Sequence, residues 1–172
     1  MARFSALAFA LAAVGAALAP PVSAKDSLGV FDAWAAFRDP AVPRCYAIAK
    51  PEDPVRKRDL ERRDYAPYAS VGTWPKRAVR NQVHFRLSRE LSARPAIRLT
   101  IGSRSFALTG GGGDGWSQDK TMDAAIVAAM RSASRMTVSA TDKRGNRFSD
   151  RYSLQGAPTA IDAATIGCSR NR

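Results

Sequence analysis

The chain has 172 residues and a formal net charge of +12, from 27 lysines and arginines against 15 aspartates and glutamates. This length suits one domain of ordinary size and leaves no room for several. A single histidine and two cysteines argue against a zinc site, which takes several such ligands. The positive charge favours anionic partners such as membrane head groups, acidic polysaccharides or nucleic acid, although it also serves simply to solvate a surface.

The first 24 residues have the parts of a secretory signal peptide. Arg3 supplies a positive start, residues 4–19 form an apolar run, and Val22-Ser23-Ala24 offers small residues to a signal peptidase. The alternative is a membrane-spanning helix, but the run is shorter than the roughly 20 apolar residues that a span needs. We therefore expect residues 1–24 to be cleaved and residues 25–172 to form a single exported domain, in the periplasm, at the outer envelope or secreted. Nucleic acid is not an expected partner there.

The first part of the mature chain is predicted to form two β-strands followed by a charged loop. Aromatic residues at 31, 34 and 37 predict a first strand with a bulge over Leu28 to Arg38, and Arg44 to Ala49 predicts a second strand. Lys50 to Asp64 combines two prolines with a dense mix of charges, which predicts a surface loop with room for a turn of helix. Apolar character returns from Tyr65 to Trp74, and Pro75 ends that segment.

Three stretches give the clearest strand signal. Apolar and polar residues alternate along 83–88, 97–101 and 106–108, with a two-residue hairpin signal at Gly102-Ser103. This period of two predicts three short antiparallel strands with polar outer faces. The glycines of 110–113 then predict a flexible connection from the sheet to a helix.

One substantial helix is predicted after Trp116. Apolar residues from Met122 to Ala133 fall on one helical face, and Asp119 is suited to cap its first turn. Strand alternation returns at 136–140 and 148–154, with a turn at 143–146 between them. Asp150 has the parity of the inward residues, so an arginine or backbone amides should satisfy its carboxylate, because burying it unpaired is costly.

The two cysteines of an exported chain are expected to pair, which gives a Cys45–Cys168 disulfide. Nearly the whole mature chain lies inside this loop, and closing a loop of that length contributes about 4–5 kcal/mol in the chain-entropy model. The tail from Pro158 to Ile166 is predicted to make one or two helical turns that bring Cys168 to the core.

A set of residues along most of the mature chain forms a recognisable pattern. It comprises Phe31-Asp32-Ala33-Trp34, Cys45-Tyr46, Trp116 after a glycine-rich loop, the helical run 124–131, the strand 136–140, Gly145, Asp150, Tyr152-Ser153-Leu154, Gly156, Ala160 and Cys168. This pattern resembles the invasion-associated locus B proteins of bacteria. Two positions depart from it: Phe37-Arg38 stands where members often have another cysteine, and Ala157-Pro158 replaces an aromatic residue.

The resemblance implies a mainly β fold, an immunoglobulin-like antiparallel β-sandwich with one packed α-helix, which agrees with the strand pattern above. It also implies an exported envelope protein with no established enzymatic activity, linked in some members to host-cell invasion. The expected partner is then an envelope or host protein.

Catalytic chemistry has little support in the sequence. A hydrolase using His84 with a serine and an aspartate is conceivable, but nothing resembles a nucleophile elbow, and His84 has outward parity beside Arg86. Gly110 and Gly115 have the spacing of a phosphate-binding loop, yet Trp116 occupies the place of its essential lysine. We therefore predict no enzyme, no cofactor and no metal.

Basic residues supply the remaining hypothesis. The candidates are Arg56, Lys57, Arg58, Arg62 and Arg63 in one loop, with Arg86 and Arg98 on the solvent side of strands predicted to be neighbours. Converging in space, they would bind lipid head groups, lipopolysaccharide or acidic glycans, since the planar guanidinium suits phosphate and carboxylate. The alternative is local pairing with Asp59, Glu61 and Asp64. A non-enzymatic interaction domain is the leading hypothesis, this anion-binding module the second, and the His84 hydrolase the third.

Overall fold

A computed structural model describes residues 24–54 and 57–169. The predicted signal peptide, except Ala24, lies outside these described residues. The described strands are β1 (Asp26–Phe31), β2 (Trp34–Asp39), β3 (Arg44–Ala49), β4 (Tyr68–Trp74), β5 (Val79–Arg86), β6 (Ile97–Ile101), β7 (Arg104–Gly111), β8 (Asp114–Trp116), β9 (Arg135–Thr141) and β10 (Arg147–Ser153). The described helices are α1 (Lys57–Glu61), α2 (Lys120–Met130) and α3 (Ala157–Ser169), with a 3-10 turn at Pro75–Arg77.

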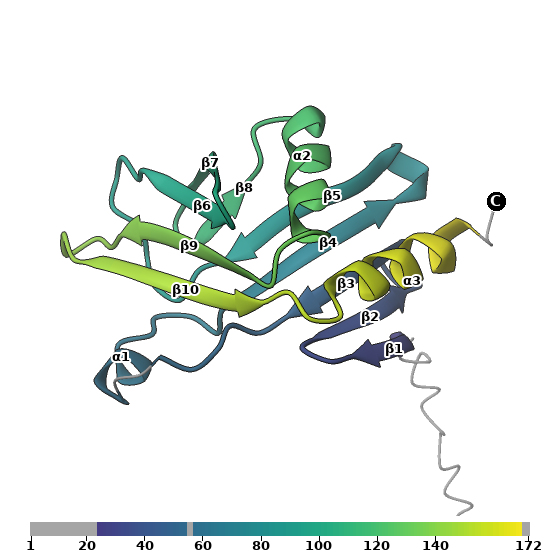
Figure 1. Cartoon of the computed structure of the whole chain (residues 1–172), viewed down its shortest axis with the longest axis horizontal. Helices are drawn as coiled ribbons and strands as arrows, with labels where there is room; N and C mark the ends of the chain where they lie inside the picture. The colour runs from purple at the N-terminus through teal and green to yellow at the C-terminus, as the bar shows by residue number, and fades with distance from the viewer. Residues whose placement is uncertain (1–23, 55–56, 170–172) are drawn as a thin grey trace, which may run out of the picture.

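Strand β7 belongs to both layers of the fold. All the strands are antiparallel, in the order β1-β2-β3-β4-β5-β8-β7-β6-β9-β10. The residues Arg104 to Leu108 of β7 pair with β6, whereas Thr109 to Gly111 pair with β8. One layer therefore contains β1 to β5 and β8, and the other contains β6, β9 and β10 (Figure 1). The prediction of a mainly β, antiparallel sandwich with a packed helix is confirmed, with the two layers joined as one folded sheet.

Alternation along the strands builds the core. The inward residues of β6 and β9 are buried, and between the layers the ring centroids of Phe85 and Tyr152 lie 6.1 Å apart. The side chains of Trp34, Phe85 and Tyr152 are at most 1% exposed. At about 25 cal/mol per Å² of apolar surface, such aromatic side chains contribute most to the stability of the core.

Helix α2 begins as the sequence predicts. The Asp119 carboxylate accepts a hydrogen bond of 2.8 Å from the backbone N–H of Met122, which caps the first turn. Ile126 and Met130 are buried, and the helix packs mainly against β5. Asp123 is buried as well, and its carboxylate accepts hydrogen bonds from the Val83 N–H and the Ser117 hydroxyl, so it joins the helix to the sheet.

Helix α3 is longer than the one or two turns predicted for the tail. It has 13 residues and packs on β1, β2 and β3. Its buried face is built largely from alanines, Ala157, Ala160 and Ala164, which carry a weak amphipathic signal but let the helix approach the sheet closely. Gly156 precedes it at φ +80°, where an added Cβ would collide with the carbonyl oxygen of Phe31. No described helix has both the length and the apolar character needed to cross a membrane.

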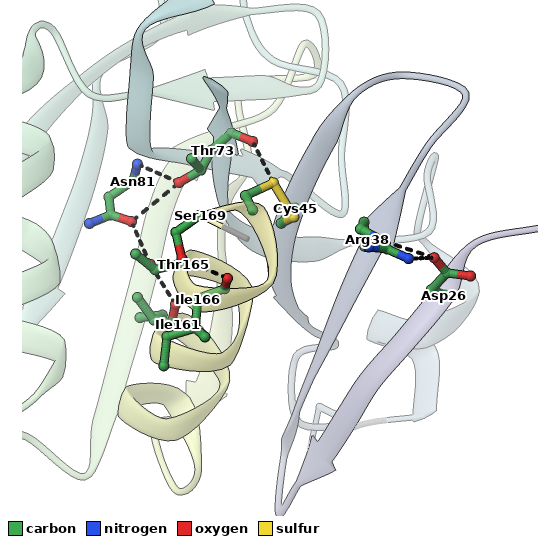
Figure 2. Close-up of a disulfide and its surroundings, with 10 residues drawn as sticks. Asp26, Arg38, Cys45, Thr73, Asn81, Ile161, Thr165, Ile166 and Ser169 are labelled. Carbon is green, nitrogen blue, oxygen red and sulfur yellow. Dashed lines mark hydrogen bonds and ion pairs between the residues drawn. A yellow bond between two sulfur atoms is a disulfide. The ribbon is translucent and has the colours of Figure 1, made fainter. Parts of the chain in front are cut away.

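The last turn of α3 is bonded covalently to β3. The sulfurs of Cys45 and Cys168 lie 2.10 Å apart, a disulfide distance, as the sequence predicts. Figure 2 shows this junction, where Thr165 also hydrogen-bonds to Asn81 of β5 through its hydroxyl. The tail is thus held to two strands of the first layer.

Three local predictions are wrong. The stretch from Leu28 to Arg38 is a hairpin of β1 and β2, which turns at Asp32 with φ +49° although no glycine marks the turn. The glycine run is no flexible connector: it forms the β7–β8 hairpin, and the Gly113 carbonyl accepts a hydrogen bond of 2.7 Å from Leu87. Strands β5 and β6 are not neighbours, because β8 and β7 lie between them.

Removing the disulfide is expected to lower the free energy of unfolding by about 2–4 kcal/mol, because the bridge restricts the unfolded chain. The measurement is urea unfolding of the Cys45→Ala, Cys168→Ala double variant beside the wild type. Dithiothreitol should reduce the stability of the wild type and leave the double variant unaffected. Equal midpoints for the oxidised and reduced wild type would contradict the bridge's contribution.

Gly156→Ala is expected to destabilise the protein more than Gly145→Ala. Both glycines have positive φ, which costs an L residue roughly 1–2 kcal/mol, but only the Cβ at position 156 meets the Phe31 carbonyl. Nothing lies within 4 Å of the corresponding position at Gly145, so it serves as a matched control. Thermal and urea unfolding give the comparison; similar losses in the two variants would contradict the collision.

Candidate functional site

The outer face of the second layer is made of arginines and hydroxyl residues. Strand alternation turns the apolar residues of β6, β9 and β10 inward, so every second residue faces outward. The outward residues are Arg98, Thr100, Arg135, Thr137, Ser139, Thr141, Arg147, Ser149, Arg151 and Ser153. We call this set the arginine–hydroxyl face. No aspartate or glutamate stands among these described positions.

Strand register places these side chains in rows. Arg98 of β6 is opposite Ser139 of β9, which is opposite Ser149 of β10. In the next row, Thr100 is opposite Thr137, which is opposite Arg151. Each row therefore combines a guanidinium with hydroxyl groups on neighbouring strands about 4.8 Å apart.

Among the described residues, only one of the four arginines has a counterion. Arg135 lies 3.5 Å from Glu52, and Arg98 donates a hydrogen bond of 3.1 Å to the Ser105 hydroxyl. Arg147 and Arg151 are exposed and form no ion pair with any residue in the described part of the chain. Charged hydrogen-bond donors without counterions make this face attractive to anions.

A cavity of about 480 Å³ opens at the free edge of β10. Its walls are residues 52–54, Asp59, Arg63, Ser88, Arg89 and 147–151. The backbone N–H of Glu52 donates a hydrogen bond of 2.7 Å to the Arg151 carbonyl, which keeps the 50s segment alongside the strand. A groove of about 540 Å³, lined by Arg98 and Ser139 among others, shares Arg147, Phe148 and Ser149 with the cavity. The cavity and the arginine–hydroxyl face are therefore continuous.

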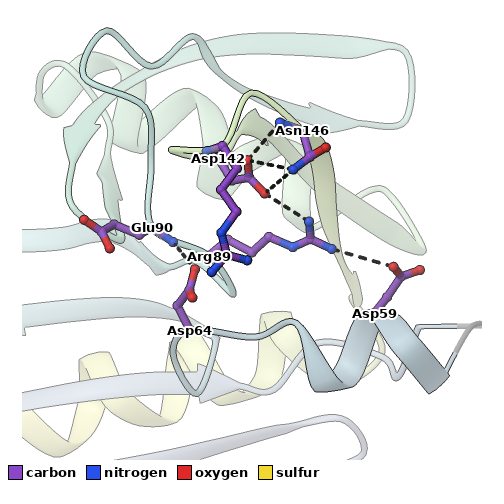
Figure 3. Close-up of polar contacts among 7 residues, drawn as sticks. Asp59, Asp64, Arg89, Glu90, Asp142 and Asn146 are labelled. Carbon is purple, nitrogen blue, oxygen red and sulfur yellow. Dashed lines mark hydrogen bonds and ion pairs between the residues drawn. The ribbon is translucent and has the colours of Figure 1, made fainter.

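A buried arginine holds one wall of the cavity. Arg89 donates a hydrogen bond of 3.1 Å to Asp142 and lies 3.7 Å from Asp59 of α1 (Figure 3). Burial by itself would raise the pKa of Asp142, but hydrogen bonds from Asn146, Arg89 and the Arg144 backbone outweigh it and lower that pKa. The cluster links α1 to the β9–β10 turn, and its Arg89 and Asp59 line the cavity.

Asp150 lines the cavity and is 4% exposed. Its carboxylate accepts a hydrogen bond of 2.8 Å from the Ser88 N–H, which confirms the prediction that a backbone amide satisfies it. Burial raises the pKa of Asp150, although the hydrogen bonds from Ser88 and the charges of Arg63 and Arg89 act in the opposite direction. Burying this carboxylate therefore costs stability, which the Ser88 hydrogen bond offsets in part.

The structure separates the basic residues that the sequence grouped together. Arg63 lines the cavity, where it lies 3.8 Å from Asp53, and Arg98 belongs to the arginine–hydroxyl face. Lys57, Arg58 and Arg62 are exposed on and just after α1, and Arg56 lies outside the described residues. These loop cations line neither the cavity nor the groove.

Arg86 lies on the other layer, which corrects the prediction that it shares a face with Arg98. Its guanidinium pairs with Asp114 at 2.5 Å and stacks 3.8 Å from the centroid of the Tyr65 ring. Sequence reasoning missed Arg147 and Arg151 instead. The signal for them was present, since they alternate with the inward residues Phe148, Asp150 and Tyr152.

His84 lies on the outer face of β5. Its Nε2 is 3.0 Å from Asp114, and its ring stacks on Trp116 with centroids 5.1 Å apart. Burial lowers the pKa of His84, partly offset by the hydrogen bond to Asp114. Within residues 24–54 and 57–169, no hydroxyl or thiol hydrogen-bonds to the imidazole, and no three acidic, histidine or cysteine side chains are placed to hold a metal.

Comparison with known proteins identifies the fold. No family model matches the chain, and neither does any curated protein. Among solved structures, invasion associated protein B from Bartonella henselae superposes with a TM-score of 0.56 over 87% of this chain and 100% of that one, at 16% identity. The chain has the fold of invasion associated protein B. The fold implied by the resemblance in the sequence is therefore confirmed.

The raised pKa of Asp150 should be detectable in the pH dependence of the protein's stability. A carboxyl whose folded pKa is raised binds its proton more tightly in the folded state, so its contribution to stability falls as the pH rises above the ordinary value of 3.8. Asp150→Asn keeps an oxygen for the Ser88 N–H but cannot ionise. We expect the stability of the wild type relative to this variant to decrease between acidic and neutral pH, measured by urea unfolding. A difference independent of pH would contradict the raised pKa.

Proposed function

We propose that this protein is an exported, non-enzymatic interaction protein whose arginine–hydroxyl face binds the phosphate or carboxylate groups of an envelope polymer, lipopolysaccharide or an acidic glycan. The observation that carries the proposal is the composition of that face. Four arginines and six hydroxyl residues occupy its outward positions.

The chemistry of the face suits oxyanions. A guanidinium presents a planar fork of donors to phosphate or carboxylate, and serine and threonine hydroxyls donate to the remaining oxygens. Such charge-assisted hydrogen bonds are stronger than neutral ones. A face with a hydroxyl beside each arginine is therefore better suited to bind an anion than an ordinary solvated surface is.

The spacing of the cations favours a repeating ligand. Arg147 and Arg151 are four residues apart on β10, or about 13 Å at the rise of a strand. Arg98 lies two strands away from β10 and lines the same groove as Arg147. Charges at such separations match several anionic groups along one polymer better than a single small ion.

Export is supported by three features. The first 24 residues read as a cleavable signal, the Cys45–Cys168 disulfide suits an oxidising compartment, and the fold is that of invasion associated protein B. A non-enzymatic role is supported by the surroundings of His84, which pairs with a carboxylate but hydrogen-bonds to no described nucleophile.

Replacing Arg147 and Arg151 together with glutamine is expected to weaken binding to lipopolysaccharide or polygalacturonate about tenfold or more, because two charge-assisted contacts are lost. The matched control is Arg58→Gln with Arg62→Gln, which removes the same charge from the exposed loop and should change the affinity little. Titration calorimetry at low and high salt measures both.

Comparing four ligands shows which kind of anion the protein binds. They are lipopolysaccharide, polygalacturonate, vesicles of phosphatidylglycerol and a neutral dextran. Binding should be absent for dextran and should weaken as salt increases. Tighter binding to the vesicles than to the two polymers would identify lipid head groups as the ligand. Equal losses in the two double variants would show attraction by net charge alone, and no binding at low salt would refute the proposal.

A further inference from the structure

Strand β10 forms an open edge of the sheet. It is the last strand in the order of the sheet and pairs with β9 alone among the described strands (Figure 1). Its pairing is regular over all seven residues, whereas β1, at the opposite edge, has a bulge between Ser27 and Gly29. Bulges are one of the features that protect an edge strand from pairing with another chain. Of the two edges, β10 is therefore better suited to accept a further strand.

The backbone groups of β10 alternate between β9 and the edge. In an antiparallel pair, every second residue directs both its N–H and its C=O away from the neighbouring strand. Two carbonyl groups show which residues these are. The Arg151 carbonyl accepts a hydrogen bond of 2.7 Å from the Glu52 N–H, and the Ser153 carbonyl accepts one of 2.9 Å from the Trp34 indole. The odd-numbered residues of β10 therefore direct their backbone groups to the edge.

Two further residues of the same parity are left without backbone partners. The N–H and C=O groups of Arg147 and Ser149 point to the edge, and no hydrogen bond joins them to another residue in the described part of the chain. Both residues line the cavity of about 480 Å³. Unpaired groups of an edge strand are what strand addition uses, in which an extended peptide continues the sheet.

The cavity encloses the place that such a peptide would take. Residues 147–151 of β10 line it together with residues 52–54 and Asp59 of α1. A strand paired with β10 lies about 4.8 Å from it, within this cavity. Because the Arg151 carbonyl is already bonded to Glu52, pairing is restricted to residues 147–149, a length of about 10 Å.

We propose that the edge of β10 binds an extended acidic peptide of another protein by antiparallel strand addition. The peptide residues opposite Arg147 and Ser149 exchange both backbone hydrogen bonds with them. Their side chains lie on the arginine–hydroxyl face, because directly opposed residues share one side of the sheet. The peptide residue between them is opposite Phe148, which is 8% exposed and lines the cavity, so an apolar side chain fits there.

Charge complementarity specifies acidic side chains at the outward positions of the peptide. The other arginines of the cavity lie near carboxylates of this chain, Arg63 at 3.8 Å from Asp53 and Arg89 at 3.7 Å from Asp59. Arg147 is exposed and has no ion-pair partner among the described residues. Opposite charges that face each other across two strands stabilise their pairing. A glutamate or aspartate opposite Arg147 therefore supplies its counterion.

A second copy of this chain fits the edge less well. Antiparallel pairing of two β10 strands about Ser149 would place Arg147 of one copy opposite Arg151 of the other. Like charges directly opposite each other destabilise a sheet. The occupant is therefore a strand of another protein, with carboxylates where β10 has guanidinium groups.

This inference goes beyond the anion-binding proposal, because it rests on backbone groups at the sheet edge and on a polypeptide ligand. Both ligands use the charge of Arg147. A test therefore has to separate backbone pairing from attraction between charges.

The first test compares three forms of the fluorophore-labelled peptide Val-Glu-Val-Glu-Val-Glu-Val. One form is unmodified, one has N-methyl groups on its three glutamates, and one has them on three of its valines, so that all have the same charge. With the glutamates outward, their N–H groups point to β10 and those of the valines point away. We expect methylation of the glutamates to weaken binding about tenfold or more relative to methylation of the valines, measured by fluorescence anisotropy.

Equal affinities of the two methylated peptides would show attraction by charge alone and overturn the proposal. No binding of the unmodified peptide at low salt would overturn it as well. A greater loss from the valine methyl groups would contradict the pairing of carboxylates with Arg147.

The second test leaves the charge of the protein unchanged. Ser149→Pro removes the edge N–H, and an edge strand tolerates proline where that N–H has no partner in the sheet. Ser149→Ala is the matched control, because it also lacks the hydroxyl but keeps the N–H. We expect Ser149→Pro to bind the unmodified peptide about tenfold or more weakly than Ser149→Ala does, at unchanged melting temperature. If Ser149→Pro does not fold, the methylated peptides carry the test alone.

Equal peptide binding by the two folded variants would overturn the strand addition. A wild-type dimer that Ser149→Pro abolishes, measured by sedimentation, would overturn it in favour of a second copy. Wild-type protein that binds the peptide but not polygalacturonate would support the strand addition and count against the anion-binding proposal alone.

Discussion

The structure depends on one strand that serves two layers. Because β7 pairs with β6 along its first part and with β8 along its last, the two layers cannot slide past each other without breaking both ladders. They enclose one core, and each layer is left with a single outer face. A one-residue slip of any strand would exchange its inward and outward side chains, so the burial of the core also determines what each outer face displays.

The glycines make this arrangement possible. An added Cβ at Gly110 would collide with the Asp114 carbonyl, and Gly113 lies against the Tyr65 ring. The hairpin between β7 and β8 is consequently tight, and its Gly112 and Gly113 carbonyls accept hydrogen bonds from Leu91 and Leu87. A stretch that looks flexible by composition is an ordered junction, and at Gly110 and Gly113 the contact distances tolerate no side chain.

Buried charge is concentrated beside the cavity. The Arg89 and Asp142 side chains are 9% and 5% exposed, and Asp150 lies close to them. Removing one partner from a buried ion pair leaves a charge without compensation, which is strongly destabilising. The cluster explains why the charged loop before β4 is held against β10, and hence why a cavity exists at that edge. The disulfide performs a corresponding role at the far end of the first layer, where it holds α3 in place.

The two outer faces divide the surface by chemistry. One offers guanidinium and hydroxyl donors in register, which suits oxyanions. The other carries aromatic rings, and the guanidinium groups stacked on them are already paired, Arg44 with Asp39 and Arg86 with Asp114. Both arise from the same alternation, since the inward half of every strand has to be apolar and the outward half is free to vary.

The sequence by itself determined the local features: the strand alternation of 83–88, 97–101, 136–140 and 148–154, the Asp119 cap, the inward parity of Asp150 and the pairing of the two cysteines. Each follows from neighbouring residues or from simple counting. Only the tertiary structure decided which strands are adjacent. That choice placed Arg86 and Arg98 on different layers and brought Arg147 into the same groove as Arg98. The periodicity of a strand predicts which side of the sheet a residue faces. Which strands are adjacent depends instead on long-range pairing and on the packing of the whole core. The alanine-rich α3 and the glycine hairpin escaped prediction for the same reason, because close packing across the chain determines them.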